Sequence, residues 1–134
     1  MRTIIIYCKK CNKRITDELV EMDRNEITFP DFADAIPEGR FTIFKDADIL
    51  NLLVNKNQPL LNDHTDSNRF TGCCGSSGIY GMNKVCINNH EVATEFSDCY
   101  TSYYLSVSLK NTIIKIVNTD GSIQQADYKF YAIK

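Results

Sequence analysis

The residues in this chain with the clearest chemistry are its cysteines and histidines. Its six cysteines and two histidines include a C-x-x-C pair at Cys8 and Cys11, and four cysteines with one histidine between Asn68 and Cys99. Thiolate sulfur and imidazole nitrogen are ligands that zinc prefers, and four of them in a tetrahedral arrangement complete a structural site. The composition of these two regions therefore indicates a metal-held core.

The first ligand pair is Cys8 and Cys11, because two intervening residues allow both sulfurs to face one ion. Asn12 follows this pair and tolerates the left-handed conformation in which such a turn ends. Cys86 and His90, in a C-x-x-x-H arrangement, form the second pair. The spacing predicts a Cys3His zinc site made of Cys8, Cys11, Cys86 and His90. The alternative is that the cysteines are small hydrophobic core residues and that His90 is a hydrogen-bonded polar residue.

Three further cysteines have two interpretations. Cys73, Cys74 and Cys99 could hold a second metal ion, or they could pack beneath the glycine-rich segment as buried free cysteines commonly do. We favour packing, since adjacent cysteines reach one tetrahedral ion poorly, although one of the three could replace His90 in the first site. Four glycines recur at every third position of this segment, without matching a phosphate-binding loop; they are Gly72, Gly75, Gly78 and Gly81. We expect them to permit positive φ and close backbone approach around the metal turns.

A second group of polar residues comes just before the glycines. His64, Asp66 and Arg69 lie within six residues and could bind a polar ligand or form an ion pair with a partner. The alternative is a solvated turn in which Asp66 pairs with Arg69.

The motifs around these residues carry a resemblance. The chain contains H-x-D-x-x-R-F-x-G-C-C-G-x-x-G-x-x-G-x-N-x-x-C, followed by N-x-H-E-V-A-T-E-x-S-D-C. Together with the N-terminal C-x-x-C, these strings resemble a group of uncharacterised small bacterial zinc-ribbon-like proteins. The resemblance implies a zinc-ribbon-like module with the cysteines and His90 as ligands. The chain departs from this pattern at residues 100–103, which read Y-T-S-Y where an aromatic residue followed by Pro-His is expected.

The remaining sequence predicts mostly strands. Residues 14–22 fit either a strand or a short helix, residues 25–39 are expected to be a loop, and a short helix could begin at Asp46 or Asp48 and continue to about Asn55. Residues 118–121 have the chemistry of a hairpin turn. Strands are expected at Arg2–Tyr7, Arg40–Phe44, Tyr103–Leu109, Thr112–Val117 and Ala126–Ile133. The predicted fold class is α+β, mainly antiparallel β, with zinc-ribbon-like knuckles, a C-terminal β-meander and a short helix.

The length and composition set the class of protein. A chain of 134 residues is expected to form a single domain over residues 1–134. No apolar run approaches the roughly 18 residues that a membrane helix needs, and the first seven residues do not form a signal peptide. We therefore expect a cytoplasmic protein, in which thiols are kept reduced and metal binding takes precedence over disulfides.

The net charge of −2 is unevenly distributed, and it suggests a binding function. Residues 15–50 contain ten acidic residues, and an acidic face between Asp17 and Asp48 would suit a basic protein partner. The leading hypothesis is thus a zinc-stabilised protein-binding module without catalysis, such as an immunity or regulatory protein. The first alternative is a nucleic-acid-binding zinc ribbon, which would use the basic residues Lys9, Lys10, Lys13 and Arg14.

A hydrolase is the least favoured class. A metal- or cysteine-dependent hydrolase could be centred on Cys74, His90 and Asp98. The chain contains neither the H-E-x-x-H motif nor the zinc-deaminase pattern, so the sequence supplies no assembled catalytic set.

Overall fold

The chain folds almost entirely into β-strands in this computed structural model, in which residues 2–131 are described. Three 3-10 turns are the only helical elements among the described residues: η1 (Arg24–Glu26), η2 (Ser67–Phe70) and η3 (Tyr128–Tyr131). None of the described helices has the length and apolar character needed to span a membrane. The strands are β1 (Thr3–Cys8), β2 (Leu19–Glu21), β3 (Arg40–Asp46), β4 (Ile49–Val54), β5 (Asn62–Asp63), β6 (Lys84–Val85), β7 (Glu91–Phe96), β8 (Tyr104–Val107), β9 (Thr112–Val117) and β10 (Ile123–Gln125).

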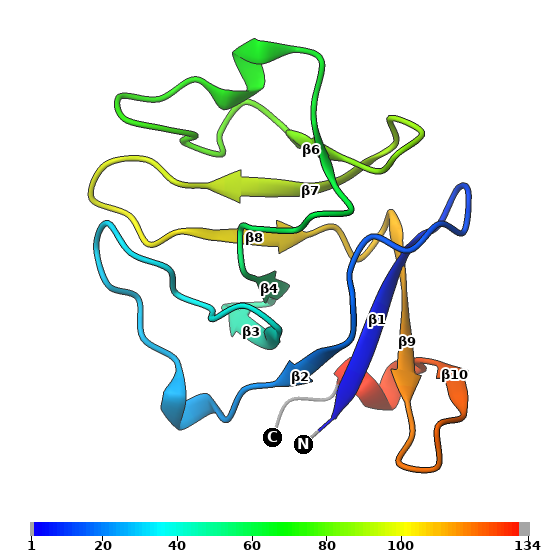
Figure 1. Ribbon diagram of the computed structural model, residues 1–134. Helices are drawn as coiled ribbons and strands as arrows, with labels where there is room; N and C mark the ends of the chain where they lie inside the picture. Colours follow the sequence, from blue (N-terminus) through cyan, green and yellow to red (C-terminus); the bar gives the residue numbers. More distant parts are fainter. Residues whose placement is uncertain (1, 132–134) are drawn as a thin grey trace.

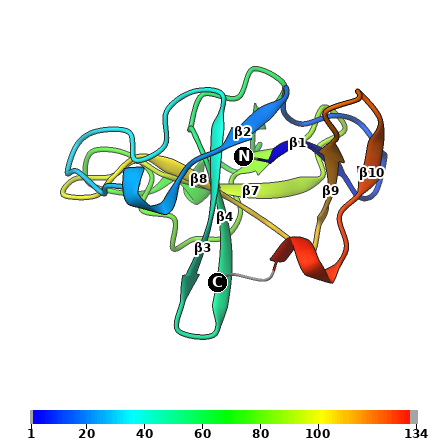
Figure 2. The same cartoon turned by 90° about the horizontal axis from the view of Figure 1, so that it is seen from below.

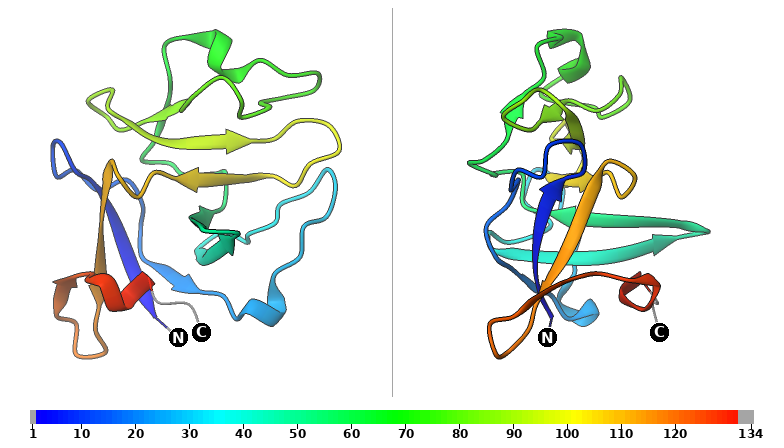
Figure 3. Two further views of the ribbon diagram at one scale, coloured as in Figure 1. Left: turned by 180° about the vertical axis from the view of Figure 1, so that it is seen from behind. Right: turned by 90° about the vertical axis from the view of Figure 1, so that its right-hand side faces the viewer.

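The strands form one strongly curved sheet. Their hydrogen-bonded order is β10-β9-β1-β2-β3-β4-β8-β7-β6-β5, and every pairing is antiparallel except that of β2 with β3. β7 and β8 run across the upper half of the molecule, whereas β1 and β9 lie at a steep angle to them (Figure 1). The β3–β4 hairpin extends out of the body in the view from below (Figure 2) and in the side view (Figure 3, right). The curvature therefore brings β1 and β9 close to the start of β7.

The curved sheet encloses a single large apolar cluster. Along β1 the period of two places Ile4, Ile6 and Cys8 on the inner face, where each is at most 1% exposed. Each fully buried aliphatic side chain contributes about 1.5–3 kcal/mol relative to an exposed one. Their partners in the cluster come from β2, β3, β4, β7, β8, β9 and η3 and include Leu19, Phe41, Leu52, Val54, Val92, Leu105, Ile114 and Phe130. The side-chain alternation that builds the core thus also carries the Cys8 thiol to its edge.

The short connection from β8 to β9 and a few side chains, rather than a strand ladder, link β1 and β9 to β7. Four strands separate β1 from β7 in the sheet order, and no ladder between the described strands connects β1 or β9 to β7. Asn111, in the turn before β9, accepts a hydrogen bond from the Lys9 backbone N–H at 3.0 Å. Its side-chain amide donates to the Glu91 carbonyl oxygen, also at 3.0 Å. Asn111 therefore connects β1 and β9 to the start of β7.

The mainly antiparallel β prediction is confirmed, but the predicted short helix is wrong. The residues expected to be helical from Asp46 or Asp48 to Asn55 instead form the turn of a hairpin and strand β4. Ala47 adopts a φ of 54° in that turn, and β4 pairs with β3 on one side and β8 on the other. A run that is apolar all round is typical of a strand buried in the interior of a sheet as well as of a buried helix, and the ladders on both sides favoured the strand.

Three other expectations need correction. Of residues 14–22 only Leu19–Glu21 form a strand, and Arg14 forms an isolated bridge with Tyr7. The C-terminal β-meander is wrong, because β8 pairs with β4 and β7 whereas β9 pairs with β1 and β10. The expected strand at residues 126–133 is wrong over its described part, since β10 ends at Gln125 and residues 128–131 form η3; residues 132 and 133 lie outside the described residues. β9 gains six paired residues from β1, more than a short meander with β8 would offer.

The Arg2–Glu21 ion pair at the open end of β1 predicts a pH dependence of stability. The Arg2 Nη2 and Glu21 Oε2 atoms lie 2.6 Å apart, and hydrogen bonding from Arg2 is the main cause that lowers the pKa of Glu21 below its ordinary value. A lowered pKa in the folded state gives stability that is present above the unfolded value of about 4.3 and is lost as the pH falls through the folded value. Glu21→Gln should therefore lower the free energy of unfolding at neutral pH, and its difference from wild type should shrink below about pH 4.

Denaturant unfolding at a series of pH values measures this difference. Glu18→Gln is the matched control, because Glu18 is exposed on the neighbouring turn and should leave the profile unchanged. A Glu21→Gln difference that stays constant from neutral to acid pH would contradict the assignment.

Candidate metal centre and adjoining basic pocket

The structure brings together the four residues predicted as metal ligands. One ligand atom each from Cys8, Cys11, Cys86 and His90 lies within 4.8 Å of every other, in an arrangement that could hold a metal ion. The Cys11 and Cys86 sulfurs are 3.8 Å apart, and the Cys8 sulfur is 3.5 Å from His90 Nδ1. We call this cluster the metal centre. It brings Cys11 to Cys86, which are 75 positions apart in the chain, and Cys8 to His90, which are 82 positions apart.

The first turn, residues 8–13, presents Cys8 and Cys11 from the end of β1. The Asn12 N–H donates to the Cys8 carbonyl oxygen and the Cys8 N–H donates to the Lys13 carbonyl oxygen, both at 2.9 Å. Asn12 has a φ of 59°, a left-handed conformation that asparagine adopts more readily than most residues. The expectation for Asn12 is therefore confirmed.

The second turn, residues 86–90, has the same construction between β6 and β7. The Asn89 N–H donates to the Cys86 carbonyl oxygen and the Cys86 N–H donates to the His90 carbonyl oxygen, both at 2.9 Å. Asn89 has a φ of 64°. The Asn88 N–H also points at the Cys86 sulfur, 3.4 Å away, a contact that stabilises a thiolate. Both turns thus place two ligands on one side of a tight loop.

The surroundings affect the cysteines of the centre differently. Hydrogen bonding from the Asn88 side chain is the largest of the effects that lower the pKa of Cys11 to about 6. Burial is the largest effect at Cys8 and raises its pKa. Cys8 and Cys86 belong to the apolar core cluster. A metal ion binding here must displace thiol protons, and the four ligands would close its coordination, as in a structural rather than a catalytic site.

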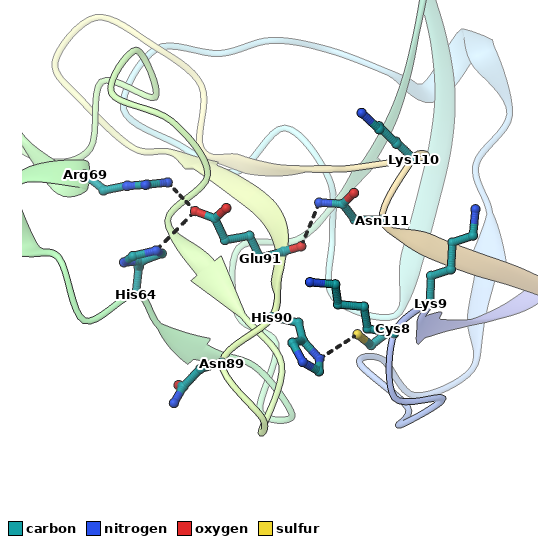
Figure 4. Close-up of a pocket in the computed structure, with 10 residues that line it drawn as sticks. Cys8, Lys9, His64, Arg69, Asn89, His90, Glu91, Lys110 and Asn111 are labelled. Carbon is teal, nitrogen blue, oxygen red and sulfur yellow. Dashed lines mark hydrogen bonds and ion pairs between the residues drawn. The ribbon is translucent and has the colours of Figure 1, made fainter.

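A pocket of about 590 Å3 opens beside the metal centre. We call it the basic pocket; Figure 4 shows Glu91 in its wall, with Arg69 and His64 on one side and Lys9 and Lys110 on the other. Arg69 forms an ion pair with the Glu91 carboxylate, and His64 Nε2 lies 3.1 Å from the same Glu91 oxygen. Its lining consists of Cys8, Lys9, Lys10, His64, Arg69, Asn89, His90, Glu91, Lys110 and Asn111.

The polar group predicted at His64, Asp66 and Arg69 divides between two roles. Asp66 caps η2 by accepting the Asn68 N–H at 3.1 Å, and it lies 3.7 Å from Arg69 Nε. The Asp66 N–H donates to His64 Nδ1 at 2.9 Å, so His64 carries its proton on Nε2 and donates it to Glu91. The solvated-turn interpretation therefore describes Asp66, whereas His64 and Arg69 line the basic pocket.

The other three cysteines form a second cluster after the end of β7. Their sulfurs also lie within 4.8 Å of one another, and Cys74 and Cys99 are joined as a disulfide with a Cα–Cα distance of 5.4 Å. Cys73 and Cys74 are exposed, which does not fit packing beneath the glycine-rich segment. The Asp98 carboxylate accepts backbone N–H groups of Cys74 and Cys99 at 2.8 and 2.7 Å; the Cys74 N–H is the main cause that lowers the pKa of Asp98.

The glycine-rich segment packs on the end of β7 rather than around the metal centre. A side chain at Gly75 would overlap the Ser97 carbonyl oxygen, and one at Gly78, where φ is 78°, would overlap the Phe96 ring. Asn83 is fully buried and holds the segment: its amide donates to Ser76 Oγ at 2.8 Å, and its oxygen accepts the Glu95 N–H at 2.7 Å. Close backbone approach is thus the use of these glycines, but at a different place from the one expected.

The structure does not bring together the three residues of the hydrolase hypothesis. Asp98 lies beside Cys74, but Cys74 is in a disulfide. His90 precedes β7, whereas Asp98 follows it, and a strand of six residues spans roughly 20 Å at about 3.3 Å per residue. His90 faces Cys8 instead. Cys74, His90 and Asp98 therefore do not form the nucleophile, base and orienting acid of that hypothesis.

Four residues of the site were not predicted from the sequence. Glu91, Asn111 and Lys110 contribute to the basic pocket, and Asn88 acts on the Cys11 thiol. Glu91 directly follows the predicted ligand His90 in the sequence, and this position indicates that Glu91 lies beside the site. Asn111 and Lys110 come from the turn before β9, whose approach to the first turn depends on the β1–β9 ladder and has no local sequence signal.

Comparisons with protein-family models, curated proteins and solved structures found no significant match to this chain. The resemblance to small bacterial zinc-ribbon-like proteins therefore stays a prediction.

Removing one ligand of the metal centre should unfold or strongly destabilise the chain. Cys86→Ser is expected to abolish binding of one metal ion per chain and to lower the melting temperature, because binding free energy at such a site is folding free energy. Elemental analysis and thermal unfolding measure both effects. Cys73→Ser is the matched control: it also removes one thiol, but an exposed one outside the centre, and it should retain the metal. Equal metal content in Cys86→Ser and wild type would contradict this assignment.

Gly75→Ala should loosen the connection between the glycine-rich segment and β7. The added methyl group cannot share space with the Ser97 backbone, so the segment must move, at a cost of about 1–3 kcal/mol. We expect a lower melting temperature and faster reduction of the Cys74–Cys99 disulfide by a small thiol. Gly39→Ala is the comparison, since a side chain there meets no atom within 4 Å and adds only the strain of a positive φ of 77°. It should leave the rate of disulfide reduction unchanged, and an unchanged rate in Gly75→Ala would refute the close-approach argument.

Proposed function

We propose that the metal centre binds zinc and that the chain is a zinc-stabilised protein-binding module. The geometry of the four ligands supports zinc. Two sulfurs bound to one tetrahedral zinc ion lie about 3.8 Å apart, and a sulfur and an imidazole nitrogen lie about 3.6 Å apart. The corresponding distances here are 3.8 Å and 3.5 Å. Thiolates and an imidazole also favour zinc over harder cations such as magnesium and calcium.

The observation that carries the binding function is an exposed aromatic groove. It has a volume of about 190 Å3 and is lined by residues of the 27–39 loop, β3, β4, β7 and β8: Phe29, Phe44, Asn51, Leu53, Phe96, Tyr104 and Ser106. The Phe29 ring lies 5.5 Å from Phe44 and 6.4 Å from Tyr104. Phe29 is nevertheless 46% exposed. An exposed group of large aromatic side chains is typical of a protein–protein interface, where such residues supply most of the binding energy.

A second exposed aromatic pair joins Phe32 of the same loop to Tyr100 of the connection between β7 and β8. Phe32 is 52% exposed and Tyr100 is 80% exposed, and their rings lie 5.3 Å apart. The loop is held to the strand region by hydrogen bonds from the Ala35 N–H to the Tyr103 carbonyl oxygen and from the Tyr103 N–H to the Ala33 carbonyl oxygen. The aromatic residues are therefore presented by a fixed loop, which lowers the entropic cost of binding.

Acidic residues give this surface its charge. Asp31 and Asp34 alternate with the aromatic residues of the loop, Asp48 lies in the β3–β4 turn near Phe44 in sequence, and all three aspartates are exposed. By contrast, Glu21 and Glu26 form ion pairs with Arg2 and Arg40. These three aspartates belong to the acidic face expected between Asp17 and Asp48, which also contains the exposed Asp17, Glu18, Asp23 and Glu38. Such a surface is complementary to a protein partner with lysine or arginine around an apolar centre, as an immunity or regulatory protein would require.

Titration of purified partners with surface variants tests this function. Proteins cross-linked to the chain in source cells are identified, and the basic ones are purified and titrated against wild type, Phe29→Ala and Asp31→Lys. We expect Phe29→Ala to weaken binding roughly 30-fold, as for the loss of an aromatic residue at the centre of an interface. Asp31→Lys should slow association and weaken its dependence on salt.

Ile79→Ala is the matched control, because Ile79 is 75% exposed but lies in the glycine-rich segment. It should bind as wild type does. If every purified partner binds wild type, Phe29→Ala and Asp31→Lys equally tightly, the aromatic groove is refuted as the interface.

A further inference from the structure

The basic pocket beside the metal centre contains cationic side chains that the fold does not use. The side-chain amino groups of Lys9, Lys10 and Lys110 have no ion pair or hydrogen bond within the described part of the chain. Lys9 and Lys10 belong to the first turn, and Lys110 belongs to the turn before β9. Figure 4 shows Lys9 and Lys110 extending on the same side of the pocket. Two chain segments thus bring free positive charge to one cavity.

The charge of the pocket remains positive after its internal pairs are counted. Lys9, Lys10, Lys110 and Arg69 contribute four positive charges and Glu91 one negative charge. A divalent ion held by three thiolates and a neutral imidazole would add one further negative charge. The positive charges of the pocket therefore outnumber the negative charges of Glu91 and of the ligated ion together. An anion of two or more charges would balance this excess.

The opposite wall of the pocket is fixed in position. The Glu91 carboxylate is held by Arg69 and His64, and Arg69 also donates to the Met82 carbonyl oxygen at 3.0 Å. Asn111 is fixed by its hydrogen bond to the Glu91 carbonyl oxygen. Polar groups held in this way can orient a ligand without a large entropic cost, so the pocket combines a preformed polar wall with exposed lysines at its edge.

We propose that the basic pocket binds a small polar molecule that carries more than one phosphate group. Its volume of about 590 Å3 falls within the range of about 300–1,000 Å3 typical of small-molecule sites. No phenylalanine, tyrosine or tryptophan lines it, so it offers no aromatic platform of the kind on which single-stranded nucleic acids stack their bases. The lining instead suits phosphate oxygens, through lysine and arginine, and hydroxyl groups, through asparagine and the Glu91 carboxylate. This site is separate from the aromatic groove and does not depend on the proposed protein partner.

Isothermal titration calorimetry with pyrophosphate as the probe tests the proposal on the full, metal-loaded chain. We expect binding that weakens as salt is raised. The double variant Lys9→Ala with Lys110→Ala should bind at least about 100-fold more weakly, since each charge-assisted contact to a phosphate contributes about tenfold or more. Metal content and melting temperature are measured for each protein, so that damage to the neighbouring metal centre is recognised.

The matched control is the double variant Lys45→Ala with Lys129→Ala. It removes the same charge from exposed lysines that do not line the pocket, and it should bind pyrophosphate as wild type does. Absence of binding by wild type, or equal weakening in both double variants with the metal retained, would overturn the proposal. Decathymidylate provides a further arm: binding tighter than that of pyrophosphate, and lost with Lys9 and Lys110, would overturn a small-molecule site in favour of nucleic acid.

Discussion

The arrangement of this molecule depends on the approach of two tight turns, one at each end of a curved sheet. Backbone ladders run from β10 to β5, but no ladder among the described strands joins β1 to β7; the short connection from β8 to β9 and a few side chains bring them together. Cys8 and Cys11 meet Cys86 and His90 there, and Asn111 adds one hydrogen bond. Bringing together residues 75 and 82 positions apart costs loop-closure entropy, which an ion held by the four ligands would offset in the folded state.

The two candidate binding surfaces differ in how far they rely on this connection. The basic pocket takes Lys9 from one side of it and Glu91 and His90 from the other, so its shape exists only while the two turns are held together. The aromatic groove lies on β3, β4, β7 and β8, which are joined by continuous antiparallel ladders. Loss of the contacts between the two turns would therefore affect the pocket directly, whereas the groove has independent backbone support.

The sequence was informative where a local rule determines the outcome. The grouping of Cys8, Cys11, Cys86 and His90 followed from ligand type and spacing, and the left-handed Asn12 followed from turn chemistry. The predictions of a helix before Asn55 and of a C-terminal meander were wrong because β4, β8 and β9 have partner strands that are distant in sequence. A short apolar run does not specify its partner. For the same reason the sequence did not predict that Lys110 and Asn111 line the basic pocket, because the β1–β9 ladder places them there.

The two cysteine clusters also have different chemistry, although their composition is similar. Three thiols of the metal centre lie at the edge of the apolar core, where a bound ion would occupy every sulfur and protect it from oxidation. The second cluster lies about one strand length away, beyond the other end of β7, and Cys73 and Cys74 there are exposed. Oxidation can therefore proceed at Cys74 and Cys99 without loss of the metal ligands. A disulfide at one end of β7 and a metal ion at the other are compatible in the same chain because burial and ligation, rather than cellular compartment alone, decide which thiols react.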